Sequence, residues 1–325
     1  MRIFVSGASG AIGSRLVPQL IDAGHEVIGT HHSASNAERL RALGAKPVAL
    51  DLLDPAAVRE AVLETRPDAI VHQATALADI RFARNFDRTF AQTNRLRTQG
   101  TDNLLAAARE AGVTRFVAQS FASLRNAREG EMVKTEDDPL DPTPVPSTRQ
   151  SNAAMRHLEH RVTETGGIAL RYGGFYGAAN DALIEPVRKR RFPIIGDGGG
   201  YTSWIHLDDA AAATVLALEH DGPAIYNIVD DEPAAVRDWL PVLAEALGAK
   251  PPRHFPKWLA RVIAGEAAVI GATEARGAAN AKATRELAWT PRYQTWRTGF
   301  PATYPTTAVA DGPKSRSAKT TRGAR

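Results

Sequence analysis

A glycine-spaced loop near the N-terminus constrains the fold of this chain more than any other feature. Three glycines stand at every third position directly after an apolar, strand-like run, Arg2–Ser6, and they open a helical pattern, Ile12–Ala23. In such a unit the glycines permit a tight turn, close approach of the backbone to a pyrophosphate, and close packing of helix on strand. The loop therefore predicts a dinucleotide site whose contacts are Gly7, Ser9, Gly10, Ala11, Ile12 and Gly13.

Short apolar runs and helical patterns alternate through the first 120 residues, which predicts parallel βαβ units. The expected strands are Arg2–Ser6, Glu26–Thr30, Lys46–Asp51, Ala69–Gln73 and Arg115–Gln119. We expect an α/β fold, a Rossmann-type doubly wound parallel sheet with a smaller C-terminal substrate-binding cap. Residues 1–172 would form the dinucleotide-binding domain, with later strands interleaved, 173–304 mainly the cap, and 305–325 a disordered basic tail.

The segment 121–148 interrupts this alternation. It contains acidic residues, several prolines and few large apolar side chains, so it predicts a long loop. Loops of that length inside a domain are usually functional. A helix over Gln150–Thr165 and a strand over Ile168–Tyr172 are expected next.

Composition excludes several classes of protein. The chain has no cysteine, hence no disulfide framework, thiolate nucleophile or cysteine-bound metal. No apolar run is long enough to span a bilayer, and a strand pattern starts at Arg2, so we expect a cytoplasmic protein without a membrane partner. The net charge of +4 equals that of the tail 305–325, which leaves residues 1–304 at zero. A specific nucleic-acid partner is therefore not expected.

The end of the second expected strand indicates which dinucleotide binds. An acidic residue there accepts hydrogen bonds from the ribose hydroxyls and favours NAD. Here His31, His32 and Ser33 follow instead, and no acid comes before Glu38. This leaves room for a 2′-phosphate, although the histidines could equally be plain exposed loop residues. We expect NADP as the cofactor, with NAD as the alternative.

Seven segments occur in an order typical of one superfamily: Gly7–Gly13, Ile70–Ala74, Gly100–Leu105, Gly112–Val117, Leu170–Gly177, Trp204–Ala210 and Arg285–Pro291. On these motifs the chain resembles the extended short-chain dehydrogenase/reductase superfamily, in its NAD-dependent epimerase/dehydratase group. The resemblance covers residues 1–300. It implies contacts to the cofactor from Asp51 and Leu52 at the adenine, Gln73 and Ala74 beside the fourth strand, and Ser120 and Tyr172 near the nicotinamide. Relatives often pair through the fourth and fifth helices, which leaves a homodimer open.

The catalytic pair usual in that superfamily is missing. It consists of a tyrosine and a lysine four residues apart on one helical face, where the ammonium lowers the pKa of the phenol for proton exchange with the substrate. No tyrosine of this chain has a lysine four residues later. Two registers of the expected helix give Thr148 with Asn152, or Ser151 with Met155. Neither pair can transfer a proton at neutral pH.

Other groups are candidates for the lost role. Ser120 and Tyr176 are the catalytic residues we expect, Ser120 as a polarising donor and Tyr176 as an acid near the nicotinamide. His206 could titrate near neutrality, but it precedes a helix and has a structural alternative. Lys134 could reach the site only if its loop folds inward, and a solvated salt bridge is the alternative. The customary asparagine of the fourth helix is Arg97 here, with Asn94 one turn earlier.

These features favour an NADP(H)-binding oxidoreductase, a reductase or dehydrogenase of a small-molecule carbonyl, alcohol or activated double bond. Two alternatives stay open. One is a catalytically inactive redox sensor that retains the cofactor, and the other is an epimerase or dehydratase. No metal is expected, because Asp208 and Asp209 have no third ligand at a suitable spacing.

Overall fold

The computed structural model describes residues 1–77, 85–177 and 183–304. Its centre is a seven-stranded parallel sheet in the order β12-β7-β5-β4-β1-β2-β3. The direction of strand order reverses between β1 and β4, which is the position where open α/β sheets bind ligands. The strands are β1 (Arg2–Ser6), β2 (Glu26–His31), β3 (Lys46–Ala49), β4 (Ala69–His72), β5 (Arg115–Phe121), β7 (Ile168–Tyr172) and β12 (Ala224–Ile228).

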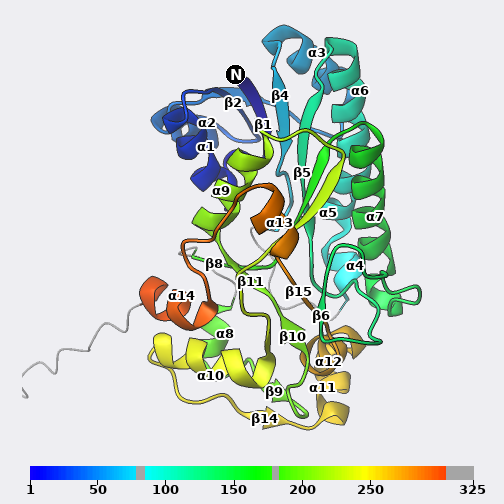
Figure 1. Ribbon diagram of the computed structural model, residues 1–325, viewed down its shortest axis with the longest axis vertical. Coiled ribbons are helices and arrows are strands. Elements are labelled where there is room, and N and C mark those ends of the chain that lie inside the picture. Colours follow the sequence, from blue (N-terminus) through cyan, green and yellow to red (C-terminus); the bar gives the residue numbers. More distant parts are fainter. Residues whose placement is uncertain (78–84, 178–182, 305–325) are drawn as a thin grey trace, which may run out of the picture.

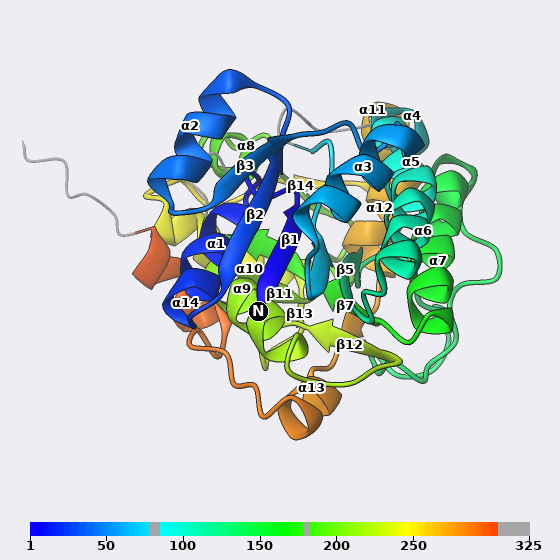
Figure 2. The ribbon, with the colours of Figure 1, turned by 90° about the horizontal axis from the view of Figure 1, so that it is seen from above.

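Helices cover both faces of this sheet (Figure 2). On one face lie α1 (Gly13–Asp22), α2 (Ala34–Ala42) and α9 (Leu207–Ala217), and α13 (Ala281–Glu286) packs beside β12. The other face carries α3 (Pro55–Thr65), α4 (Phe86–Thr89), α5 (Ala91–Arg95), a π-helical turn (Leu96–Gly100), α6 (Thr101–Ala111) and α7 (Arg149–Glu164).

Burial on both faces explains the continuous apolar strands that the sequence shows. Ile3 and Val5 of β1 pack toward α1 and α9, whereas Phe4 between them packs toward α3 and α6. Alternate side chains of a strand point to opposite faces, so each strand supplies both cores. The expected doubly wound sheet is confirmed.

A smaller unit lies beyond the carboxyl ends of the strands (Figure 1). Its helices are α8 (Ile184–Arg188), α10 (Val236–Ala246), α11 (Lys257–Ala264), α12 (Glu266–Thr273) and α14 (Trp296–Thr303). Short strand pairs join them: β8 (Gly174–Tyr176) with β11 (Trp204–His206), β9 (Ile194–Ile195) with β14 (His254–Phe255), β10 (Tyr201–Thr202) with β13 (Ala234–Ala235), and β6 (Val133–Lys134) with β15 (Gly277–Ala278).

The chain passes between the two units more than once, because α9, β12 and α13 return to the sheet after residue 173. After Phe121, the last residue of β5, the loop 121–148 contains β6, an isolated bridge between Asn126 and Leu140, and a 3₁₀ turn, Pro146–Thr148. Within the described ranges, no helix combines the length and the apolar character that a bilayer crossing requires. The tail 305–325, expected to be disordered, lies outside the described residues.

Candidate active site

The glycine loop has the geometry of a phosphate cradle. Gly7 has a φ of +81°, and a Cβ atom on it would lie 2.7 Å from the backbone of Gln73 and Ala74. A Cβ on Gly13 would lie 2.3 Å from the carbonyl oxygen of Gly7, so only glycine fits there. Helix α1 starts at this point without a side-chain cap, and the N–H groups of Ala11, Ile12 and Gly13 have no acceptor among the described residues, which leaves them for a ligand. These residues fit the diphosphate of a dinucleotide.

The end of β2 carries the three residues expected to select the cofactor. His31 is half-buried, and its Nδ1 has no hydrogen-bond partner among the described residues. His32 is exposed, and the Ser33 hydroxyl accepts a hydrogen bond from Asn36 N at 3.3 Å as the cap of α2. A polar, acid-free corner therefore lies beside the glycine loop.

The other expected cofactor contacts differ in exposure. Asp51 is exposed just after β3 and accepts a hydrogen bond from Leu53 N, and Leu52 is buried beside it. Gln73 follows β4 and donates from Nε2 to the Tyr172 hydroxyl at 3.1 Å. Tyr172 is fully buried, and its hydroxyl also pairs with Thr214 Oγ1 at 2.6 Å. The Tyr172 side chain thus lies in the core under α9, with no exposed atom for the cofactor.

The polar residues at the positions of the missing catalytic pair form hydrogen bonds within the protein. Thr148 Oγ1 donates to the carbonyl of Val145 at 3.1 Å, and Asn152 Nδ2 donates to the carbonyl of Thr148 at 3.0 Å. In the alternative register, Ser151 donates both N–H and hydroxyl to Asp87, each at 2.9 Å. Asp87 thereby satisfies the N-terminus of α7. Neither register presents a proton donor to a substrate.

Ser120 belongs to a buried ion cluster. Its hydroxyl donates to Glu159 of α7 at 2.6 Å, and Glu159 also binds Arg125 and Arg171 through both of its carboxylate oxygens. All four side chains are buried. Burial opposes ionisation, but Arg125 and Arg171 hold the pKa of Glu159 below its usual range. Ser120 therefore faces α7, and its catalytic role stays a prediction that this geometry disfavours.

Tyr176 lies in the core of the cap. It is 1% exposed, and its ring packs edge-on against His206 and Phe300. Burial, followed by the nearby Asp230 and Asp209 carboxylates, raises the pKa of its phenol above the usual range. A phenol that holds its proton this tightly, with no exposed surface, is a poor acid for a substrate. The expected role of Tyr176 is likewise disfavoured.

His206 and Lys134 also have structural partners. His206 Nδ1 accepts from Asp208 N at 3.2 Å and caps α9, and burial lowers the pKa of its imidazole. Lys134 forms a salt bridge with Asp138, as the alternative expected, but the lysine side chain is buried rather than solvated. It is 4% exposed and donates to the Glu129 carbonyl at 2.8 Å and to Asp138 at 3.3 Å. No cluster of metal ligands occurs in the described part of the chain.

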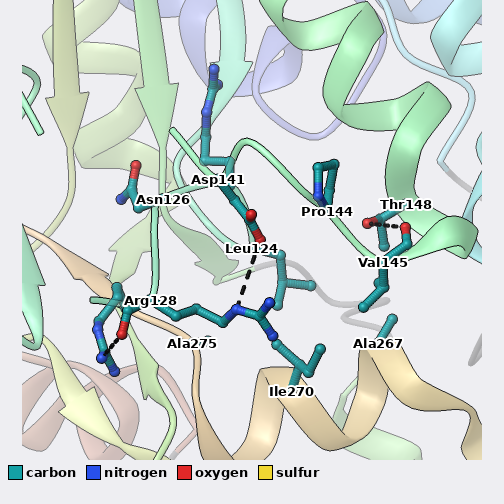
Figure 3. A pocket seen from close by; sticks show the side chains of 12 residues that line it. Leu124, Asn126, Arg128, Asp141, Pro144, Val145, Thr148, Ala267, Ile270 and Ala275 are labelled. Carbon is teal, nitrogen blue, oxygen red and sulfur yellow. Dashed lines mark hydrogen bonds and ion pairs between the residues drawn. The ribbon is translucent and has the colours of Figure 1, made fainter. Parts of the chain in front are cut away.

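A pocket lies between the loop that follows β5 and helix α12 (Figure 3). Leu124, Val145 and Ile270 give it an apolar wall. Arg128 and Asp141, with Nε and Oδ2 3.8 Å apart, add charges. It borders Thr148, and hence one of the two positions expected for the tyrosine.

Three buried ionic residues of this region were not expected from the sequence: Arg125, Glu159 and Arg171. One signal was available. Arg171 interrupts the otherwise apolar and aromatic strand β7, and a charge inside a buried strand requires an ionic partner. Nothing in the helical pattern of α7 singled out Glu159.

Comparisons with known proteins agree with this fold. The model of the NAD dependent epimerase/dehydratase family matches residues 3–229. The chain is 40% identical over 308 residues to a "3-diazoavenalumate denitrifying reductase" of Streptomyces sp, covering 92% of this chain and 99% of the relative. It is 30% identical over 258 residues to a farnesyl dihydroquinoline-oxide ketoreductase of Stigmatella aurantiaca, covering 77% and 74%.

Solved structures share the fold. A UDP-glucose 4-epimerase of Thermotoga maritima, solved with UDP-glucose, has a TM-score of 0.73 at 22% identity and covers 94% of this chain and 97% of its own. A UDP-glucose 4-epimerase of Thermus thermophilus, solved with NAD, has a TM-score of 0.68 at 24% identity, covering 94% and 100%. The chain belongs to the NAD dependent epimerase/dehydratase family, and it is an NAD(P)-dependent enzyme of the oxidoreductase type.

Proposed function

We propose that this enzyme is an NADP(H)-dependent reductase that removes the nitrogen of a diazonium group from a small organic carboxylate. The observation that carries the proposal is the absence of a tyrosine–lysine pair in a chain whose 40% identical relative is named as a denitrifying reductase of a diazo compound. The two facts fit one chemistry, because that reaction needs a hydride and no proton.

The stoichiometry explains why a proton donor is dispensable. A carbonyl that gains a hydride becomes an alkoxide and must then take up a proton. An arenediazonium ion that gains a hydride at its terminal nitrogen becomes a neutral aryl diazene. Loss of N₂ then breaks the C–N and N–H bonds and forms a C–H bond, so the diazene's own proton passes to the ring carbon and no external acid is consumed. The nicotinamide, when bound, supplies the two electrons and the hydrogen, so charge and atoms balance without an acid.

What the chain itself supplies is binding and exclusion of competing acids. The glycine loop would hold the diphosphate, and the hydrogen-bonded Thr148, Ser151 and Asn152 would present no group that protonates the substrate. Orientation of the substrate is then the main catalytic contribution.

NADP(H) is the cofactor that the second strand favours. His31, His32 and Ser33 provide donors at the end of β2, and no carboxylate stands there to repel a 2′-phosphate. The structural relatives solved with NAD support binding of the dinucleotide but leave the choice between the two forms open. We expect a lower Kd for NADPH than for NADH.

The test traces the hydrogen that the cofactor transfers to the substrate. Purified enzyme is given NADPH deuterated at C4 on either face, with carboxybenzenediazonium as substrate, and benzoate is analysed by mass spectrometry. The proposal expects deuterium to leave one face of the cofactor only, with one N₂ released for each NADPH oxidised. Because an N–H hydrogen exchanges with water, the label found in benzoate shows only whether the diazene hydrogen reaches the ring before it exchanges. Gly13→Ala, which cannot form the loop, controls for direct reduction by free cofactor.

A carbonyl reductase is the second candidate, because two relatives are named as a ketoreductase and a 2-alkyl-3-oxoalkanoate reductase. Turnover of oxo acids, with no release of N₂ above the Gly13→Ala control, would establish that alternative and refute the proposal.

A further inference from the structure

Among the described residues, Arg97 is a buried cation without an anionic partner. It lies in the π-helical turn Leu96–Gly100 and is 5% exposed. Its Nε donates to no acceptor, and no carboxylate within the described ranges forms an ion pair with it. A guanidinium carries five donors and is costly to bury unless an anion or hydrogen-bond acceptors surround it.

The nearest acid cannot serve Arg97. Glu159 lies close enough to influence Arg97, but its Oε1 already accepts from Ser120, Arg125 and Arg171, and its Oε2 from Arg125 and Arg171. Among the described residues, Glu136 is a second carboxylate close enough for the charge of Arg171 to act on it, but no carboxylate pairs with Arg97. The partner that Arg97 lacks within the described ranges is therefore an anion.

The position of Arg97 points to the substrate as the source of that anion. The turn of Arg97 is fixed to the end of β4, since His72 Nε2 pairs with the Leu96 carbonyl at 3.3 Å. Arg125 follows the end of β5. The carboxyl ends of β4 and β5 are the edge where an α/β sheet binds its ligands. Buried polar atoms without partners, Asn94 Oδ1 and Thr101 Oγ1, occur one turn before and one turn after Arg97.

We propose that the Arg97 guanidinium binds an anionic oxygen of the substrate, a carboxylate or a phenolate, and so takes the place of the missing tyrosine as the group that polarises the substrate. The substrate class rests on the function proposed above. Burial lowers the pKa of Arg97 to about 10, so the group is still a cation at neutral pH. It can donate hydrogen bonds to an oxyanion but does not give up a proton there.

A binding role and a structural role predict opposite effects of a neutral replacement. If Arg97 awaits a ligand, its unpaired charge destabilises the free protein, and Arg97→Met should leave the melting temperature unchanged or raise it. If Arg97 holds the fold together, the same change should lower the melting temperature. Arg95→Met is the matched control, because Arg95 lies on α5, two residues away, and is exposed.

The experiment measures anion binding to the full-length enzyme saturated with NADPH. Benzoate and 4-nitrophenolate are titrated calorimetrically, with benzamide as the neutral counterpart of benzoate, against the wild type, Arg97→Met, Arg97→Lys and Arg95→Met. We expect Arg97→Met to lower the affinity for at least one anion by about tenfold or more, as for loss of a charge-assisted hydrogen bond. Arg97→Lys should lose less, and benzamide should be unaffected. Which of the two anions responds tells whether a carboxylate or a phenolate is bound.

Three results overturn the proposal: a lowered melting temperature of Arg97→Met, unchanged affinity of Arg97→Met for both anions, or a loss of anion binding that instead follows Arg276→Met, a variant of the pocket of Figure 3 that is titrated in parallel. Because binding is measured without turnover, the two proposals fail separately. Anion binding that depends on Arg97 in an enzyme that does not reduce diazonium ions would refute the proposed function alone.

Discussion

Replacement of Glu159 by glutamine tests the buried ion cluster directly. Glu159 accepts five hydrogen bonds, one from Ser120 and two each from Arg125 and Arg171. Glutamine has nearly the same shape, but it is neutral and turns an NH₂ group toward at least one guanidinium. The change leaves two buried arginines with no counter-charge.

The expected cost follows from the burial of the pair. Removing one partner of a buried ion pair costs about 3–5 kcal/mol, because the other charge stays buried and unpaired. An unfolding entropy of about 2.1 cal/mol/K per residue, over roughly 290 folded residues, gives about 0.6 kcal/mol per degree. Glu159→Gln should therefore lower the melting temperature by about 5–8 °C. Thermal unfolding followed by circular dichroism measures this shift.

The pH dependence provides a second measurement on the same variant. The folded pKa of Glu159 is lowered, so its stabilisation is present above the pKa of a free glutamate and is lost as pH falls through the folded value. The gap between the wild type and Glu159→Gln should thus narrow on acidification below the usual glutamate range.

Two controls separate charge from general damage to α7. Glu164→Gln removes an exposed partner of Arg161 on the same helix and should change stability by less than about 0.5 kcal/mol. The combined replacement Arg125→Met, Glu159→Leu, Arg171→Met removes the charges together and should destabilise less than Glu159→Gln alone. A loss below about 1 kcal/mol in Glu159→Gln would refute the view that the cluster depends on its one carboxylate.

Three further predictions concern the cofactor site and the cap. Gly13→Ala places a Cβ 2.3 Å from the Gly7 carbonyl oxygen. It should lower the affinity for NADPH by more than about tenfold in a fluorescence titration. His32→Asp should raise the ratio of NADH to NADPH affinity in the same titration, because a carboxylate repels the 2′-phosphate. Burial raises the pKa of Asp230 to about 8, so the contribution of Asp230 to stability is lost as pH rises through 8. Asp230→Asn should therefore have a higher melting temperature than the wild type above that pH. An unchanged difference in melting temperature between the two proteins at pH 6 and pH 9 would contradict this.

Local patterns were sufficient to predict six of the seven strands of the sheet, and β12 was not among the expected strands. The strands expected at Arg2–Ser6 and Ile168–Tyr172 have the observed bounds, and α3 begins at a proline, a residue type favoured in the first helical turn. Each of these depends on neighbours in sequence: an apolar run, a proline at the first turn, a glycine at the turn. The third strand ends at Ala49 rather than Asp51, so the predicted adenine residue stands just after the strand.

The interior of the site could not be predicted in the same way. Ser120 and Arg171 are register partners on β5 and β7, and Glu159 reaches both from α7. Those contacts arise from tertiary packing between residues as far apart in sequence as Ser120 and Arg171, which no local period encodes. The same packing buries Tyr172 and Tyr176, whose motifs alone placed them beside the nicotinamide.

The residues that differ from the family in this site replace proton donors by groups that do not release a proton. Where the family uses a phenol and an ammonium that pass a proton, this chain has hydroxyl and amide groups committed to the backbone and to Asp87. Where the family has an amide in the fourth helix, this chain has the buried cation Arg97. A guanidinium stabilises negative charge as well as a phenol does but keeps its proton at neutral pH. Such a site suits a substrate that already carries an oxyanion and needs only a hydride, and it is poorly suited to a ketone, whose alkoxide product must be protonated. The two proposals therefore rest on different residues and support each other. Helix α7 lacks an acid that could protonate the substrate, and Arg97 would supply the positive charge that binds the oxyanion of the substrate.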